Sequence, residues 1–116
     1  MNSISTDATE LPRAITNYQA AHDRRDVLTA LAQFTIDSDV VDDGRTYKGI
    51  SGVESFLRMA GSEYTYSRTL IAAEEIAPYR WRVTNHLEGN FPGGHVDLSY
   101  EFHIVGGLIS RLVIAP

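Results

Sequence analysis

An aspartate at the end of a predicted strand is the first residue whose position could give acid–base chemistry. Asp42 lies two residues after Val40 in an extended segment over 34–47, so both side chains share a face, which is inward if Val40 is in the core. A buried carboxylate has a raised pKa because desolvation penalises its charged form, and it can take a proton from a carbon next to a carbonyl group. The alternative is that Asp42 only forms, with Asp43-Gly44, the polar end of a hairpin.

Tyr18 is the second candidate, because it lies on the apolar stripe of a predicted helix over about 10–24. A buried phenol needs a hydrogen-bond partner, and the oxygen of a forming enolate is a suitable one. The alternative is a core tyrosine that donates to a backbone carbonyl or to Asp42.

Two further polar residues each have two interpretations. Asn85 occupies an inward strand position between apolar residues, so it either orients a ligand carbonyl or satisfies a local break in backbone pairing. His22 ends the stripe of the first helix, so it either reaches the mouth of a pocket or acts as a cation at the C-terminal end of that helix.

Caps and periodicity predict the helices that must position these side chains. Helices are expected over about residues 10–24, 26–33 and 51–60. Thr9 and Asp26 are predicted to cap the first two. Ser51 and Glu54 suggest a capping box for the third, which Gly61 ends. The residues expected to face inward from the second helix are Leu28, Leu31 and Ala32.

From Glu63 onward the hydrophobic period changes to two, which predicts strands. Glycine-containing turns at 92–94 and 106–107 separate them. The inward positions are Tyr79, Trp81, Val83, Asn85 and Leu87, then Val96, Leu98, Tyr100, Phe102 and Ile104. Helices followed by antiparallel strands indicate an α+β fold in which helices cover one face of a sheet.

Composition excludes several classes of function. The 116 residues suit one domain, 1–116, and the absence of cysteine excludes disulfides, thiolate metal sites and cysteine nucleophiles and favours a reducing cytoplasm. A net charge of −5 opposes nucleic-acid binding, and no apolar run is long enough to suggest a membrane partner. His86 and His103 occupy outward strand positions, so no metal site is expected.

The order of elements around these residues resembles a known family. Tyr18, the cap Asp26, a short helix and a strand ending in residues 40–44 resemble the front half of the ketosteroid isomerase-like branch of the nuclear transport factor 2-like superfamily, which also contains SnoaL-like polyketide cyclases. The resemblance implies a cystatin-like cone, with three N-terminal helices packed on a curved, mainly antiparallel sheet. It also implies that Asp42 is the base and Tyr18 the phenol donor.

A third role implied by the resemblance belongs to Tyr100. Counting back from the Gly106-Gly107 turn places it where ketosteroid isomerases have a protonated aspartate that donates a hydrogen bond. Tyrosine can also donate one, but its larger ring narrows the pocket, which favours a substrate smaller than a steroid.

The resemblance implies a protein with a small-molecule pocket. It is expected to act as a cofactor-independent isomerase or cyclase, by acid–base chemistry on a small apolar carbonyl compound. The residues expected to contact the ligand are Phe56, Trp81, Val83, Asn85, Leu98 and Leu112. The alternatives are a non-catalytic ligand-binding or carrier domain, and an interaction module whose cone is filled. A homodimer is expected through the outward sheet face, where mixed charges alternate with core residues.

Overall fold

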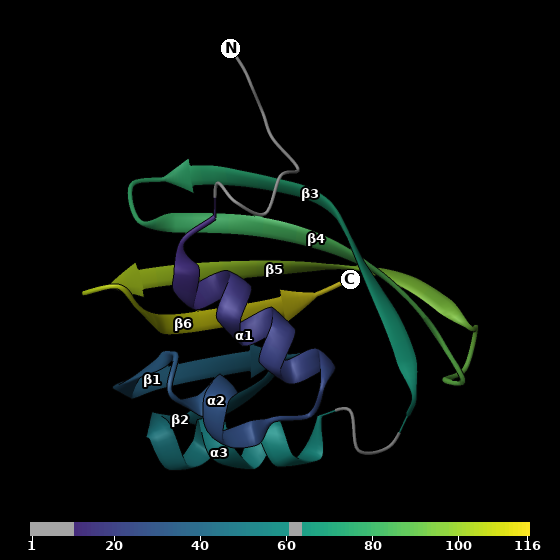
Figure 1. The fold of residues 1–116 in the computed structure, drawn as a ribbon, viewed down its shortest axis with the longest axis horizontal. Coiled ribbons are helices and arrows are strands. Elements are labelled where there is room, and N and C mark those ends of the chain that lie inside the picture. Colours follow the sequence, from purple (N-terminus) through teal and green to yellow (C-terminus); the bar gives the residue numbers. More distant parts are fainter. Residues whose placement is uncertain (1–10, 61–63) are drawn as a thin grey trace.

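The computed structural model describes residues 11–60 and 64–116, which form three helices and six strands (Figure 1). The elements are α1 (Arg13–Asp23), α2 (Val27–Leu31), β1 (Phe34–Asp42), β2 (Arg45–Lys48), α3 (Gly49–Met59), β3 (Tyr66–Ala77), β4 (Arg80–Gly89), β5 (His95–Val105) and β6 (Leu108–Ala115). The roles predicted for Thr9, Gly61 and Glu63 fall outside the described residues. Within the described residues, no helix is both long and apolar enough to cross a membrane.

All six strands belong to one sheet in the order β2-β1-β6-β5-β4-β3. Neighbouring strands are antiparallel except β1 and β6, which pair in parallel. The C-terminal strand therefore lies in the middle of the sheet, and the helices lie together against one face of it (Figure 1). The expected α+β class is confirmed, but only two helices precede the first strand, since α3 follows the β1–β2 hairpin.

The helix boundaries follow local signals in two cases out of three. Pro12 precedes the first turn of α1, where the N–H that proline lacks has no partner to lose. The predicted Asp26 cap is confirmed, because its carboxylate accepts a hydrogen bond from the Thr29 N–H at 3.1 Å. The capping box predicted at Ser51 is wrong: α3 starts at Gly49, directly after β2.

The reason for this difference is a backbone turn that glycine makes easy. Gly49 has a φ of +71°, so the chain bends from strand into helix two residues before the expected cap. Lys48 then stands at the N-cap position and makes no side-chain hydrogen bond there. Glu54 is paired instead with Arg58, one turn later, at 2.7 Å.

One core joins the helices to the inner face of the sheet. Helix α1 buries Ala14, Ile15, Tyr18, Gln19 and Ala21, and α3 buries Val53, Phe56 and Leu57. The prediction that Leu28 and Ala32 face inward is wrong, since Leu28 is 71% exposed and Ala32 is exposed as well. Helix α2 has little more than one turn, and Val27, Ala30 and Leu31 occupy its core side.

The predicted alternation in the strands is confirmed over most of β4 and β5. Val83, Asn85 and Leu87 are buried in β4, as are Tyr100, Phe102 and Ile104 in β5. Tyr79 is the exception, because it lies in the β3–β4 turn with a φ of +62° and is 72% exposed. Strand alternation stops at such a turn, so parity no longer fixes the direction of the side chain.

Candidate functional site

A cavity of about 330 Å³ opens on the inner face of the sheet, near the C-terminal ends of α1 and α3. Its lining is Tyr18, His22, Asp42, Phe56, Ala60, Tyr64, Tyr66, Leu87, Phe91, Val96, Leu98, Tyr100 and Ile114. Apolar and aromatic walls with a few polar groups are typical of a small-molecule site.

Sheet pairing brings the candidate base close to one of the candidate donors. Asp42 of β1 is the register partner of Ile114 in β6, and Ile114 is the register partner of Tyr100 in β5. The three residues form one row across adjacent strands, and two strand spacings separate the Asp42 and Tyr100 backbones by about 10 Å. All three line the cavity, with Tyr18 of α1.

The two neighbouring aspartates have different environments. Asp42 is half-buried and lines the cavity, whereas Asp43 is exposed in the β1–β2 turn with a φ of +53°. Burial raises the pKa of the Asp42 carboxyl, and the charge of Asp43 raises it further. A carboxylate with a raised pKa binds a proton more readily, as a base for carbon acids requires.

Tyr18 carries a phenol hydroxyl that is buried and unpaired. The side chain is 1% exposed, and its Oη has no hydrogen-bond partner among the described residues, neither a backbone carbonyl nor Asp42. Its ring packs edge-on against Phe34 and Phe102. Burial raises the pKa of this phenol well above its ordinary value, so the hydroxyl keeps its proton and is a potential donor.

Tyr100 supplies a second buried phenol to the same cavity. Its ring stacks on Phe102, with ring centroids 6.3 Å apart. Burial raises the pKa of Tyr100 far above its ordinary value, while the charge of Arg68 and the side chain of Asn85 act in the opposite direction. Tyr100 is therefore also protonated at neutral pH.

His22 lines the cavity as a neutral side chain. Its ring stacks on Tyr18 at a centroid distance of 5.6 Å and on Phe56 at 6.4 Å. Burial lowers the pKa of this imidazole, which argues against the interpretation of His22 as a helix-terminal cation. Of the two interpretations of His22, the position at the pocket is the one that the structure supports.

The residues expected to contact a ligand divide into two groups. Phe56 and Leu98 line the cavity. The other four, Trp81, Val83, Asn85 and Leu112, are not part of its lining. Val83 and Leu112 are fully buried in the core, and Trp81 packs against the same core. Strand parity gives the inner face correctly, but it does not separate the part covered by helices from the part left open.

Arg68 was not among the residues predicted from the sequence, and it connects β3 to α1 and β4 on the inner side of the sheet. Arg68 of β3 donates from Nε and Nη2 to the Asp23 carboxylate, at 2.9 and 2.8 Å. Its Nη1 donates to Asn85 Oδ1 at 3.0 Å and to Gln19 Oε1 at 3.4 Å. The available signal was alternation in β3, which gives Arg68 the same face as Tyr66 and Leu70.

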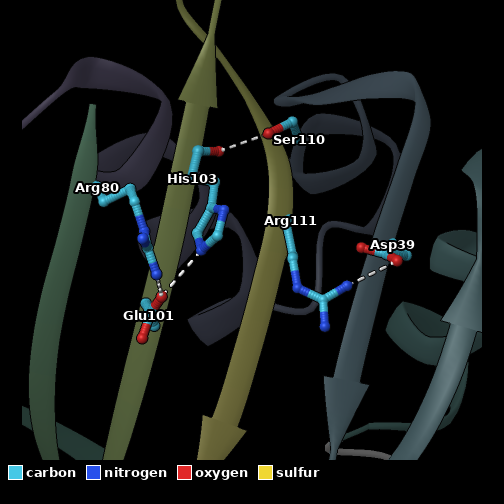
Figure 2. A network of polar contacts seen from close by, with 6 residues as sticks. All are labelled: Asp39, Arg80, Glu101, His103, Ser110 and Arg111. Carbon is cyan, nitrogen blue, oxygen red and sulfur yellow. Dashed lines mark hydrogen bonds and ion pairs between the residues drawn. The ribbon is translucent and has the colours of Figure 1, made fainter. Parts of the chain in front are cut away.

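The outer face of the sheet carries a separate polar network (Figure 2). Glu101 accepts hydrogen bonds from Arg80 at 2.7 Å and from His103 at 2.9 Å, and Arg111 pairs with Asp39 at 2.8 Å. Further along β4, His86 lies between Asp97 and Glu88, at 2.6 and 2.8 Å. No group of three potential metal ligands gathers within residues 11–60 and 64–116.

Solved structures with a similar fold include two complexes with small molecules. A candidate polyketide cyclase from Sinorhizobium meliloti is 26% identical, with a TM-score of 0.87 over 94% of this chain and 99% of that one. A protein with a ketosteroid isomerase-like fold from Catenulispora acidiphila, in complex with trimethylamine, is 17% identical, with a TM-score of 0.78 over 90% of this chain and 85% of that one. A Mycobacterium tuberculosis protein in complex with estradiol-17β-hemisuccinate is 18% identical, with a TM-score of 0.73 over 89% and 90%.

Comparison with protein-family models and with curated protein sequences gives no match. The structural similarities nevertheless extend over nearly the whole chain and include a further protein described as nuclear transport factor 2-like. The chain is therefore similar in fold to the SnoaL-like, nuclear transport factor 2-like superfamily.

Proposed function

We propose that the chain binds a small, mostly apolar carbonyl compound in this cavity and converts it by cofactor-independent acid–base chemistry, as an isomerase or a cyclase. The observation that carries the proposal is the unpaired, buried hydroxyl of Tyr18 in a cavity that also holds the Asp42 carboxyl. A buried donor without a partner destabilises the fold, and a ligand oxygen would satisfy it.

In this proposal Asp42 takes a proton from the carbon next to the substrate carbonyl, and the electrons of the broken C–H bond form an enolate. The hydroxyls of Tyr18 and Tyr100 donate to the enolate oxygen and stabilise its charge. Asp42 then returns the proton to a different carbon in an isomerase. In a cyclase the enolate carbon attacks a second carbonyl carbon, and the resulting alkoxide takes the proton.

The volume of the cavity and the ligands bound by similar structures both support a small ligand. Its volume of about 330 Å³ lies at the lower end of the range for ligand pockets. An open cavity also argues against an interaction module with a filled cone. The ligand complexes of the Catenulispora acidiphila and Mycobacterium tuberculosis proteins support small-molecule binding by a protein of this fold. Binding without turnover would make the chain a carrier, the second candidate.

Hydrogen exchange at carbon tests the catalytic proposal without a known substrate. Small cyclic ketones are incubated with the protein in D₂O, and deuterium uptake next to the carbonyl is followed by NMR. We expect Asp42→Asn to slow the enzyme-dependent uptake by about 10²–10⁴-fold, which is the usual contribution of a general base. Asp43→Asn is the matched control, because Asp43 is exposed in the adjacent turn, and it should retain the exchange.

Equal exchange in the wild-type and Asp42→Asn proteins would exclude Asp42 as the base. Ketone binding without any exchange would favour the carrier.

We further propose a homodimer through the outer face of the sheet. The network of Figure 2 spans β4, β5, β6 and β1, and its charges of both signs suit the self-complementary contacts of a two-fold interface. Sedimentation velocity at micromolar concentration should give twice the mass of the chain. Ser99→Arg, on the outer face of β5, should give monomers, whereas Ser51→Arg, on the exposed side of α3, should not. A monomeric wild-type protein would contradict the proposal.

A further inference from the structure

A second cavity, of about 220 Å³, lies where α2 packs against α1 and α3 (Figure 1). Val27, Ala30 and Leu57 give it an apolar wall. His22 and Ala60 line both this cavity and the one that contains the candidate base, so the two cavities adjoin. The volume of the second cavity lies below the usual range for drug-sized ligands, so it suits only a small molecule.

The charged groups of the second cavity do not cancel. Arg25 lines it and makes no ion pair among the described residues. Arg58 also lines it, and is paired with Glu54 at 2.7 Å in an exposed contact of a kind that is weak in water. Asp26 is the carboxylate of the lining, and it is already paired with Arg24 at 3.3 Å. The cavity therefore has an excess of positive charge, in a chain whose net charge is −5.

Arg25 occupies a backbone position that usually belongs to glycine. Its N–H donates to the His22 carbonyl at 3.0 Å, and the Asp26 N–H donates to the Ala21 carbonyl at 2.8 Å, which are the two bonds of a Schellman motif at the end of α1. Arg25 has a φ of +60°, a conformation that strains most side chains but not glycine. The backbone by itself therefore favours glycine here, and what arginine adds is its guanidinium group.

One hydrogen bond holds this guanidinium in place. Arg25 Nη2 donates to the Tyr64 carbonyl oxygen at 2.7 Å. The other N–H groups of the guanidinium have no hydrogen-bond partner among the described residues. Guanidinium groups match carboxylates in shape and bind them with paired, charge-assisted hydrogen bonds. A guanidinium that is already anchored loses less conformational freedom when it binds a ligand.

We propose that the second cavity is a binding site for a small carboxylate with a short hydrocarbon chain. The carboxylate is held by Arg25 and by Arg58, which can turn from its exposed partner. The hydrocarbon chain covers the apolar wall of Val27, Ala30 and Leu57. This inference goes beyond the proposed function and does not depend on it. The alternative is a structural role, in which Arg25 only ties the end of α1 to the segment before β3.

Three probes separate the contribution of charge from that of shape. Butyrate has a carboxylate and a hydrocarbon chain, butyramide has nearly the same shape without the charge, and formate has the charge without the chain. Each is titrated into ¹⁵N-labelled protein at neutral pH and low ionic strength, where charges are screened least, and amide shifts are followed by NMR. We expect saturable shifts with butyrate at Arg25, Val27 and Leu57, and affinity about tenfold higher than for the other two probes.

Variants at one position test the role of the guanidinium. Arg25→Asn removes the charge but keeps the turn, because asparagine also tolerates a positive φ, and the affinity for butyrate should fall about tenfold. Arg25→Lys keeps the charge without the planar fork and should retain part of the affinity. Arg25→Gly relieves the strain and replaces Arg25→Asn if that variant folds poorly. Arg13→Asn is the matched control, because Arg13 is exposed at the other end of α1, and it should bind butyrate as the wild-type protein does.

The outcomes are decisive in both directions. Butyrate binding at the second cavity that weakens in Arg25→Asn but not in Arg13→Asn supports the proposal. Equal affinities for butyrate and either of the other probes refute it, as do equal effects of the two variants. Shifts confined to Tyr66 and Leu98 would place butyrate in the other cavity and leave Arg25 with the structural role. None of these results bears on exchange at carbon, which depends on Asp42, so the two proposals can fail independently.

Discussion

Removal of one oxygen atom from Tyr18 should increase stability and decrease activity. The side chain is 1% exposed and its hydroxyl has no hydrogen-bond partner among the described residues. Leaving a buried polar group unsatisfied costs about 1–3 kcal/mol. Tyr18→Phe keeps the ring and its packing on Phe34 and Phe102, so we expect the free energy of unfolding to rise by about 1 kcal/mol.

The same substitution removes one of the two donors proposed for the enolate oxygen. Loss of a single donor of this kind costs about 10²–10³-fold in rate, and we expect a loss of this size in deuterium uptake by bound ketones. Urea denaturation gives the stability, with wild-type and variant proteins compared at equal slope. Tyr79→Phe is the matched control, because Tyr79 is 72% exposed in a turn, and it should change neither quantity.

The two measurements must change in opposite directions for the reasoning to hold. A Tyr18→Phe protein that is less stable by about 1 kcal/mol would show that the hydroxyl is satisfied in the folded state. A more stable protein with unchanged exchange would place the hydroxyl outside the reacting site. Both results would refute a role that depends on an unpaired donor.

The pH dependence of exchange should follow Asp42, which must be ionised to act as a base. Burial raises the pKa of Asp42, and the charge of Asp43 raises it further, so the exchange rate should fall with decreasing pH at a pH above the pKa of an ordinary aspartate. Asp43→Asn should move this fall to lower pH, and an unchanged pH profile would contradict the assignment of Asp42 as the base. Because the pKa of Asp42 is higher in the folded protein than in the unfolded chain, Asp42 stabilises the fold below its unfolded pKa, and this contribution is lost as the pH rises through its folded pKa. Urea denaturation of Asp42→Asn should no longer show this pH dependence of stability. Leu112→Ala should cost about 2–5 kcal/mol because the side chain is fully buried. Leu28→Ala should stay within about 0.5 kcal/mol, and a larger loss would mean that Leu28 is part of the core after all.

The sequence predicted those features of the fold that depend on neighbours along the chain. The Asp26 cap and the Asp43-Gly44 turn are fixed by side-chain and backbone preferences within a few residues, and both are found in the structure. The alternation in β4 and β5 follows from the two-residue repeat of a strand. The same local signals failed at Ser51, where the glycine bend started the helix earlier.

Local patterns also indicated which side chains face inward, but not what each of them meets there. Val83 and Leu98 both occupy inward positions, yet one is in the closed core and the other lines the cavity. The difference depends on where the helices lie over the sheet, and that arrangement is set by packing of residues far apart in sequence. Arg68 was missed for the same reason, because its partners come from α1 and β4.

Tyr18, Asp42 and Tyr100 were identified as candidates from their residue types, their local pattern and a resemblance to a family. Only the tertiary structure decided that they surround one cavity. Parallel pairing of β1 with β6 places Asp42 beside Ile114, and antiparallel pairing of β6 with β5 places Tyr100 on the other side of it. Strand pairing over such separations is determined by the whole sheet rather than by any segment of it, so the sequence by itself provides the residues and the tertiary structure provides the site.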